Sequence, residues 1–263
     1  MKPKFVRCLW GKENHKFFEK NLSSYHNECR ITKSVDDKFG LENQIVIVWD
    51  EVNRKLMEEL GYPYHYMGPS MDFTYSFNFY HKIMALIKAM EMFDEIIFLD
   101  WDCYIQKPLD ENFYTLLKSG GDIQMPLYVY PKETLDRFRT IIPGGNEGQN
   151  YYNLLFYHTI RNGKWFFNEG ILVPNAGFIY CRDKKFFKQL DTIQRTQGII
   201  SNIEEICAMI YFNKTIDTMD EYLDKHEPKV CLGKDDEEMD GHQLHLNQHT
   251  TSKLNKDIYF IHE

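Results

Sequence analysis

The chain has 263 residues, 43% of them hydrophobic and 27% charged, which is the composition of a globular protein. With 31 Lys and Arg against 39 Asp and Glu, the formal net charge is −8, so the protein as a whole does not attract a nucleic-acid backbone. No local basic patch offsets this charge, and we expect no nucleic-acid partner. The length fits one large domain or two modest ones.

The cysteines and the apolar segments indicate the compartment. Six cysteines are scattered without a CxxC pair, which favours reduced, buried thiols over a disulfide scaffold. The basic residues at the N-terminus are not followed by the apolar stretch of a signal peptide. No run approaches the roughly 18 apolar residues of a membrane span. We therefore expect a soluble, cytoplasmic protein with no transmembrane segment.

The first part of the chain alternates predicted strands and helices. Residues 5–10 form an apolar run that ends at Gly11, and residues 44–49 are a continuous β-branched run, typical of a strand buried on both faces. Residues 52–60 read as a helix closed by Gly61. This order predicts an α/β fold with a parallel sheet.

The next segment carries the most chemical information. Residues 79–93 have the apolar spacing of an amphipathic helix, and residues 95–105 read as one apolar strand that carries Asp100 and Asp102. Side chains at i and i+2 of a strand point to the same face, where the two carboxylates would repel each other unless a divalent cation binds them. Ligands of open α/β sheets bind at the carboxyl ends of strands, so we expect a Mg²⁺ or Mn²⁺ site here.

Four further elements follow in chain order. We expect a strand over 122–130, a turn that enters a strand over 171–181, and helices over 184–194 and 202–213. The chain ends in an apolar stretch, residues 258–262. No linker rich in Gly, Ser or Pro divides the sequence, so a single domain is predicted.

At this point the sequence resembles the GT-A fold of nucleotide-sugar-dependent glycosyltransferases. The likeness lies in residues 80–103, where a helix with a basic residue leads into the strand and the D-x-D, and in the Pro-Asn-Ala-Gly-Phe-Ile-Tyr-Cys segment 174–181. It implies a Rossmann-type α/β sandwich with a mostly parallel central sheet flanked by helices. Residues 1–102 would form the nucleotide-sugar-binding half and residues 103–263 the acceptor-binding half.

The resemblance implies a metal-dependent transfer of a sugar from a nucleoside diphosphate sugar to a hydroxyl of a glycan or another acceptor. Asp102 would bind Mn²⁺ or Mg²⁺, Asp100 would share the metal or hold the donor ribose, and His262 would be a late additional metal ligand. Lys82 would face the diphosphate, where its charge offsets that of the leaving nucleotide. A solvated position on the helix surface is the alternative for Lys82.

The other residues implied at the donor site follow the ends of strands. Trp10, Gly11, Trp49 and Asp50 would form the nucleoside-binding site, although Trp49 would serve equally well as a core residue. Asn175 and Gly177 would border the donor sugar, or simply form a turn.

A catalytic base is harder to assign. Glu204 and Glu205 begin the helix after Asn202, in a region where inverting members of the family carry an acidic residue. Glu205 also fits a capping box with Asn202, so Glu204 is the preferred candidate for the base. Glu169 is a further candidate, and the sequence leaves open whether the reaction inverts or retains the sugar configuration.

Other hypotheses compete with that of a glycosyltransferase. The D-x-D also echoes the first motif of haloacid dehalogenase phosphohydrolases, where Asp100 would be the nucleophile, but that family places the motif on its first strand. A non-catalytic carbohydrate- or nucleotide-binding protein is a third possibility. Three histidines at 242, 245 and 249 suggest zinc, but they lack further ligands at a recognised spacing and are better explained as surface or core residues.

Overall fold

A computed structural model of the protein describes residues 2–11, 40–71, 80–101, 103–105, 109–130, 165–166, 170–197, 203–234 and 257–262; for some of them, including β5, β8 and β12, the backbone alone is described. In chain order the elements are β1 (Lys4–Leu9), η1 (Leu41–Asn43), β2 (Gln44–Val48), α3 (Glu51–Leu60), β3 (Tyr64–Tyr66), α4 (Tyr80–Met92), β4 (Ile96–Leu99), β5 (Cys103–Ile105), α5 (Glu111–Ser119), β6 (Ile123–Gln124), β7 (Leu127–Tyr130), β8 (Trp165–Phe166), β9 (Gly170–Pro174), β10 (Phe178–Cys181), α8 (Phe186–Gln197), α9 (Ile203–Thr215), α10 (Met219–Lys225), β11 (Val230–Lys234) and β12 (Asp257–His262).

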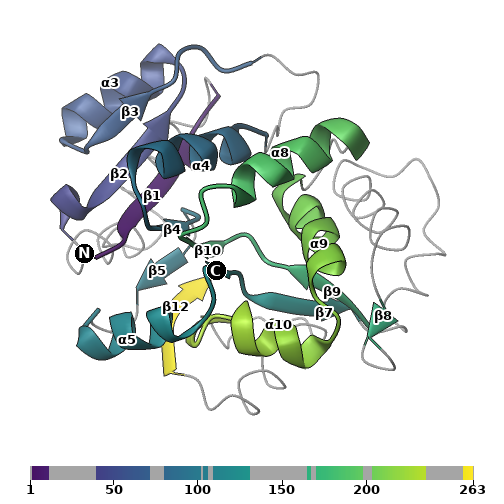
Figure 1. Cartoon of the computed structure of the whole chain (residues 1–263). Coiled ribbons are helices and arrows are strands. Elements are labelled where there is room, and N and C mark those ends of the chain that lie inside the picture. The colour runs from purple at the N-terminus through teal and green to yellow at the C-terminus, as the bar shows by residue number, and fades with distance from the viewer. Residues whose placement is uncertain are drawn as a thin grey trace.

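The central sheet has six strands in the order β3-β2-β1-β4-β10-β6 (Figure 1). The first four strands of this order run parallel, whereas β10 pairs antiparallel with both β4 and β6. This agrees with the predicted mostly parallel sheet. Two further sheets of three strands, β11-β12-β5 and β7-β9-β8, complete the described architecture.

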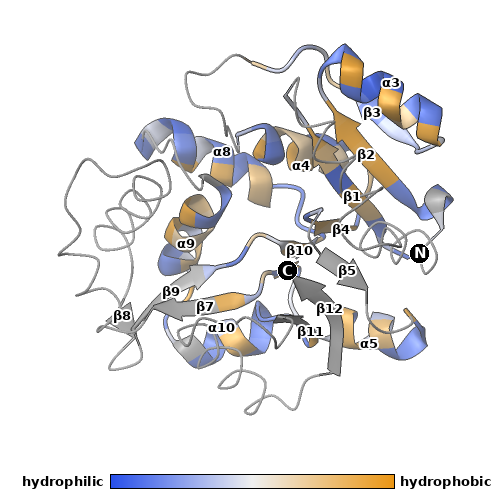
Figure 2. Ribbon diagram, turned by 180° about the vertical axis from the view of Figure 1, so that it is seen from behind, coloured by the Kyte–Doolittle hydropathy of each residue, from blue (hydrophilic) through white to orange (hydrophobic). Residues whose placement is uncertain are grey.

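Alternate residues of each strand point to opposite faces of the central sheet. Both of these faces are buried. On one face, Val6 and Phe98 belong to a core that includes residues of α4, α8 and α9. On the other face, Phe5 and Leu99 pack with α5, and Val46 packs with α3. Helices on both sides of a largely parallel sheet explain why the strands read as continuous apolar runs. Strand β2 is hydrophobic except at its start, Gln44, whereas α3 and α8 mix hydrophobic and hydrophilic residues (Figure 2).

Helix α3 shows how local sequence sets an element's bounds. Its buried residues, Leu56 and Met57 among them, face the sheet. The helix ends at Gly61, whose left-handed conformation (φ 74°) lets its N–H bond to the carbonyls of the last turn. The predicted closure of this helix at Gly61 is therefore confirmed.

Two predicted strands are each divided in the structure, and those predictions were wrong. Residues 95–105 form β4 and β5 in different sheets, because the chain turns at Trp101 and β5 pairs with β12. Residues 122–130 form β6 and β7, which also lie in different sheets. Pro126 between them has no N–H for a sheet, and the Met125 N–H bonds to the His226 carbonyl instead.

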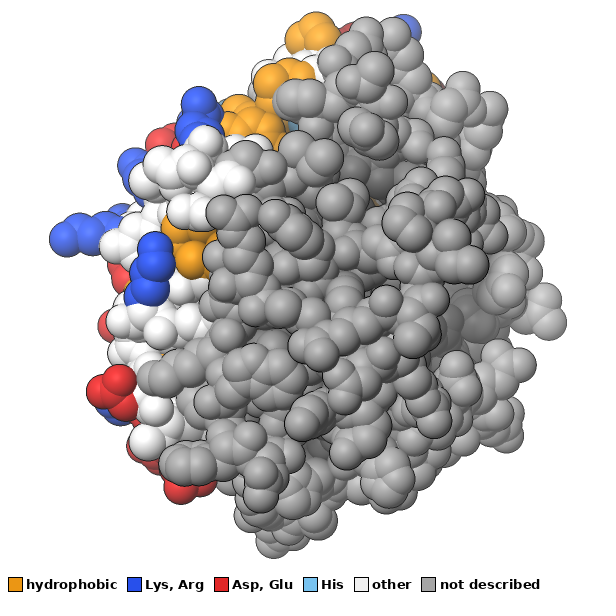
Figure 3. Space-filling model, turned by 90° about the vertical axis from the view of Figure 1, so that its right-hand side faces the viewer, with side chains coloured by type: hydrophobic (Ala, Val, Ile, Leu, Met, Phe, Trp, Pro, Cys, Tyr) orange, Lys and Arg blue, Asp and Glu red, His pale blue; other side chains and the backbone are white. Residues whose placement is uncertain are grey.

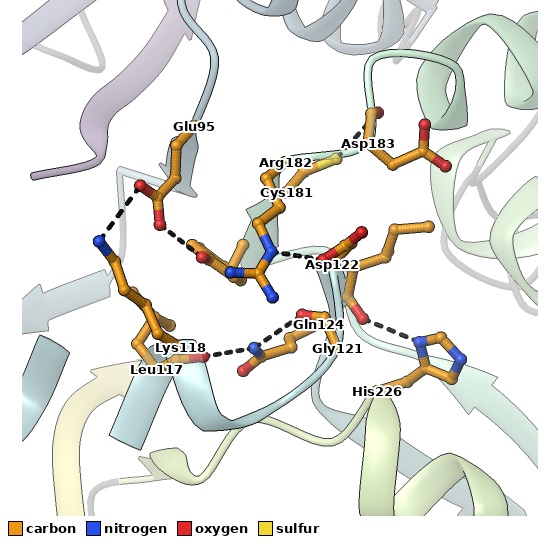
Figure 4. Close-up of polar contacts among 12 residues, drawn as sticks. Glu95, Leu117, Lys118, Gly121, Asp122, Gln124, Cys181, Arg182, Asp183 and His226 are labelled. Carbon is orange, nitrogen blue, oxygen red and sulfur yellow. Dashed lines mark hydrogen bonds and ion pairs between the residues drawn. The ribbon is translucent and has the colours of Figure 1, made fainter. Parts of the chain in front are cut away.

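A polar network lies at the N-terminal end of β4 (Figure 4). Glu95 accepts a hydrogen bond from the buried Tyr180 hydroxyl and lies 3.7 Å from the Lys118 ammonium, while Arg182 pairs with Asp122. We refer to Glu95, Tyr180, Lys118, Arg182 and Asp122 as the distal network, because Asp100 lies at the other end of β4. The distal network joins the central sheet to α5 through Glu95 and Lys118, and it includes the Arg182–Asp122 ion pair.

The described cysteines are buried, and the described surface carries charges of both signs (Figure 3). Cys8, Cys181 and Cys207 are buried free thiols, as predicted for these three. On the face shown in Figure 3, the described side chains include Lys and Arg next to Asp and Glu, with hydrophobic groups toward the top. None of the described helices is both long enough and apolar enough to cross a membrane.

Candidate active site

The sequence-predicted donor residues meet at one edge of the central sheet. Parallel strands β1, β2 and β4 end there, and each is followed by candidate residues: Trp10 and Gly11, Trp49 and Asp50, and Asp100. Antiparallel β10 begins at the same edge, so the turn at residues 175–177 reaches Asp100, whose N–H donates to the Gly177 carbonyl at 2.9 Å. The topology therefore assembles residues from four separate parts of the chain, as expected at the carboxyl ends of strands.

Lys82, Asp100 and Glu204 form a buried group that we call the lysine cluster. The Lys82 ammonium lies 3.0 Å from the Asp100 carboxylate and 3.3 Å from Glu204. Lys82 and Glu204 are 2% and 5% exposed, whereas the Asp100 side chain is 34% exposed. The solvated alternative for Lys82 is thus wrong, because α4 turns this residue inward, onto the Phe98 ring and the two carboxylates.

One ammonium facing two carboxylates sets the ionisation of this cluster. Burial lowers the pKa of Lys82, but the charges of Asp100 and Glu204 raise that pKa by more, so the ammonium stays charged. Burial raises the pKa of Glu204, and the nearby Lys82 offsets only part of that rise. Glu204 Oε2 has no hydrogen-bond partner among the described residues. The protonated form of Glu204 is therefore favoured more here than in water.

Three aromatic rings, Trp10, Trp49 and His81, form what we call the aromatic corner, next to the lysine cluster. The Trp10 and His81 rings are stacked, with centroids 5.8 Å apart and an interplanar angle of 12°. Trp49 meets His81 edge-on at 5.2 Å and is 3% exposed. Trp49 is thus a core residue by burial, and it still borders the corner.

Asp50 ties three strand ends together. It has a positive φ of 64° and precedes α3 without capping it through its side chain. Its carboxylate instead accepts hydrogen bonds from the N–H groups of Gly11 and Ser70, both at 2.9 Å. The Asn53 side chain adds a hydrogen bond to the Gly11 carbonyl at 3.2 Å. Asp50 is 6% exposed, so these contacts fix the loops after β1 and β3 from within.

The turn before β10 is held by side chains at the same edge. Asn175 Oδ1 accepts from the Gly177 N–H at 2.8 Å, which is the geometry of an Asx turn. Glu205 Oε1 accepts from the Ala176 N–H at 3.3 Å, so Glu205 supports this turn. Asn202, its expected capping partner, lies outside the described residues. Glu205 therefore has a structural contact that the helix pattern did not reveal.

The predicted metal ligands are only partly described. Asp102 lies outside the described residues, as do the side chain of His262 and the further candidates Glu169, His242, His245 and His249. Among the described side chains, no three His, Cys, Asp or Glu lie close enough to hold a metal ion. The backbone nevertheless places His262 opposite Cys103, the residue after Asp102. Carboxylate oxygens suit Mn²⁺ or Mg²⁺, and the Asp100 side chain is partly exposed, so one of its oxygens can reach solvent.

Sequence reasoning missed two contributors to this edge. His81 lies beside Lys82 in the helix, but nothing in the helical pattern indicated that it contacts two tryptophans. Ser70, in the segment after β3, contributes a backbone N–H, which no sequence motif reports. Both contacts join segments that only the folded chain brings together.

The strand order gives the predicted α/β sandwich with a mostly parallel sheet, and this is the GT-A fold seen in the solved structure of the galactosyltransferase LgtC. Among solved structures, the galactosyltransferase LgtC in complex with donor and acceptor sugar analogues matches 98% of this chain and 86% of its own, at 11% identity and a TM-score of 0.53. Mouse xyloside xylosyltransferase 1 in its apo form covers 100% of this chain and 98% of its own, at 12% identity and a TM-score of 0.49. No protein-family model and no curated protein sequence matches the chain.

The likeness to LgtC confirms the predicted fold and covers almost the whole chain. It gives no support to the haloacid dehalogenase alternative, and β4 comes after β1, β2 and β3 among the described strands, whereas that family places its motif on the first strand. At 11% identity the comparison speaks for the fold alone. The roles of individual residues rest on the geometry of the sheet edge.

Proposed function

We propose that the protein is a metal-dependent glycosyltransferase that moves a sugar from a nucleoside diphosphate sugar to a hydroxyl of a glycan or another acceptor. In this reaction the acceptor oxygen bonds to the anomeric carbon, and the bond from that carbon to the diphosphate oxygen breaks. The hydroxyl proton leaves to a base or to the departing phosphate. The observation that carries the proposal is the meeting of Asp100, the aromatic corner and the Asn175 turn at one edge of a GT-A sheet.

Asp100, Asp102 and His262 are the residues that would hold Mn²⁺ or Mg²⁺. The donor set fits a hard cation, and the pairing of β12 with β5 brings the backbone of His262 next to the D-x-D. Such a cation, when bound, supplies charge that stabilises the diphosphate as a leaving group. The Lys82 ammonium, 3.0 Å from Asp100 and 3.3 Å from Glu204, reduces the repulsion between these two carboxylates and keeps Asp100 in place.

The rest of the edge suits the donor. Trp10 and Asp50 would border the nucleoside, and Asn175 and Gly177 would border the sugar. Aromatic faces suit nucleobases and sugars, and buried carboxylates hold the loops that carry them. Glu204 remains the candidate base, and its burial raises its pKa above the ordinary value of a glutamate.

A thermal-shift screen tests donor binding. We expect a nucleoside diphosphate or its sugar to raise the melting temperature in the presence of Mn²⁺, because a ligand at 100 times its Kd stabilises the native state by about 2.7 kcal/mol. Donor turnover to an acceptor, or slow hydrolysis of the donor, then separates a transferase from a binding protein. Binding without any turnover would favour the non-catalytic alternative.

Asp102→Ala is the sharpest single variant. We expect it to abolish turnover while the unfolding transition stays close to that of the wild type. Asp94→Ala is the matched control, since this aspartate is highly exposed and pairs with Lys184 before β4 begins. Activity that persists in Asp102→Ala, or after complete removal of metal by a chelator, would refute metal-dependent transfer.

A further inference from the structure

His81 is a buried histidine whose contacts reach three separate strand ends. It is 1% exposed and lies in the first turn of α4, next to Lys82. Its ring stacks on Trp10, which follows β1, and meets the edge of Trp49, which follows β2. Its Nε2 lies 3.1 Å from the N–H of Met71, in the segment after β3.

The hydrogen bond to Met71 defines the form of the ring. A backbone N–H can only donate, so Nε2 of His81 must accept, and the proton of the neutral imidazole is on Nδ1. This places the ring as a neutral acceptor for Met71 and, at the same time, as a flat surface against Trp10. A phenyl ring would keep the flat surface and lose the acceptor, whereas a glutamine would keep an acceptor and lose the flat surface.

Asp50 and His81 hold the same loops from two sides. Asp50 binds the N–H groups of Gly11 and Ser70, and His81 contacts their neighbours Trp10 and Met71. Residues 67–71 are therefore fastened at Gly68, Ser70 and Met71. Without His81, the Trp10 ring and the Met71 backbone lose the group that holds them to α4.

We propose that His81 is a positioning residue for the donor nucleoside: by stacking on Trp10 and accepting from Met71, it fixes the two loops that border the base. The inference rests on the proposed function, because it assumes that a nucleotide binds at the aromatic corner. His81 acts through Trp10 and the loop, so its loss weakens nucleotide binding and leaves the chemical step largely unchanged.

The test compares His81→Phe and His81→Gln with the wild type in titrations of uridine diphosphate and guanosine diphosphate with Mn²⁺, measured by calorimetry. For whichever nucleotide the wild type binds, we expect each variant to bind about fivefold to tenfold more weakly, the effect of one misplaced hydrogen bond or stack. With the donor sugar, KM rises by a similar factor while kcat is retained. His65→Phe, in the middle of β3 with Lys88 of α4 as its charged neighbour, is the matched control and should bind as the wild type does.

The outcomes separate this inference from the proposed function. If the wild type binds a nucleotide and both variants bind it equally well, the role of His81 is refuted and the proposed function stands. If the wild type binds neither nucleotide, both are refuted. Nitrogen NMR of the wild type with labelled histidine is a second test. It must show that the His81 ring is neutral and protonated on Nδ1. The signals of this ring must also shift when nucleotide is added. Protonation on Nε2, or signals that do not shift, would overturn the inference.

Discussion

An ammonium group as buried as that of Lys82 must be paired, because desolvating an isolated charge is costly. Its two partners come from distant parts of the chain: Asp100 follows β4, and Glu204 lies in the first turn of α9. The residue therefore links α4, the central sheet and α9 at the candidate active site. The charge of Lys82 therefore has a structural role. The contact of Lys82 with a donor diphosphate stays a prediction.

Lys82→Met tests this structural charge. The variant leaves Glu204 buried without its cation, and breaking a buried pair in this way typically costs about 3–5 kcal/mol of unfolding free energy. The loss should be smaller at pH 5 than at pH 8, because the pKa of Glu204 is raised by burial and a protonated carboxyl carries no unpaired charge. Urea unfolding at both pH values measures it.

The control for that variant is on the same helix. Lys88 has a side chain 31% exposed, with its ammonium 3.5 Å from Glu91. Lys88→Met should change the unfolding free energy by only about 0.5 kcal/mol, as is usual for surface positions. Equal losses in the two variants would show that the burial of Lys82 does not matter.

His226 leads to a prediction about how stability depends on pH. Its ring packs on Phe212 at 4.7 Å, and its Nδ1 lies 2.9 Å from the Ile123 carbonyl. Burial lowers the pKa of His226; of the nearby charges, Lys225 lowers that pKa further and Glu221 raises it. A lowered pKa means that folding favours the neutral ring, so this stabilisation is complete above the unfolded value of about 6.5 and is lost as the pH falls below it.

Urea unfolding between pH 5 and pH 8 checks this expectation. In the wild type the unfolding free energy should fall toward pH 5, and in His226→Asn part of that fall should disappear. Asparagine can still donate to the Ile123 carbonyl and does not titrate. Identical pH profiles for the two proteins would show that His226 is not the group responsible.

At the scale of elements, the ends of β1, β2 and β3 depend on Asp50. Its carboxylate satisfies two backbone N–H groups from other segments, and its backbone (φ 64°, ψ 139°) lies outside the regions that residues with a side chain usually adopt. The same residue therefore sets both the geometry of the loops and the direction in which the chain enters α3.

Asp50→Ala should lower the unfolding free energy by about 2–3 kcal/mol, because the N–H groups of Gly11 and Ser70 lose their acceptor. Asp50→Asn keeps one acceptor oxygen, so its loss of unfolding free energy should be smaller. Both variants should also weaken nucleotide binding in the calorimetric assay.

Asp110→Ala provides the comparison. Asp110 caps α5 by accepting from the Phe113 N–H at 2.9 Å, and the loss of such a cap costs about 1 kcal/mol. This variant should leave nucleotide binding unchanged. If Asp50→Ala bound nucleotide as the wild type does, the loops it holds would not be part of the donor site.

For the whole molecule, the two ends of β4 should contribute differently to stability and to function. The lysine cluster and the aromatic corner lie at one end, and the distal network lies at the other (Figure 4). Tyr180 is fully buried and donates to Glu95, opposite the first half of β4. Stability should therefore be separable from donor binding by variants at the distal end.

Tyr180→Phe is the variant that tests this separation. It removes a hydrogen bond to a charged group, and we expect a loss of about 1.5–3 kcal/mol in unfolding free energy. Nucleotide affinity and kcat should stay at the wild-type values. A clear change in nucleotide affinity would show that the sheet transmits strain from one end to the other.

The strand and helix patterns of this protein were readable from its sequence because apolar periodicity is local. Residues 44–48 and 80–92 fold as their spacing predicts, and the D-x-D after an apolar strand pointed to the edge where the candidate residues meet. The division of residues 95–105 was not readable, because it depends on β12, a strand at the far end of the chain.

Tertiary structure alone decided what each candidate side chain touches. Helical spacing marks Lys82 as a residue of α4, but only packing against α9 turns its ammonium toward Glu204. The same holds for His81 between two tryptophans and for Asp50 beneath two loops. Local sequence sets backbone conformation and the apolar face of an element, whereas the partners of a buried charge are chosen by strands and helices that pair over long distances in the chain.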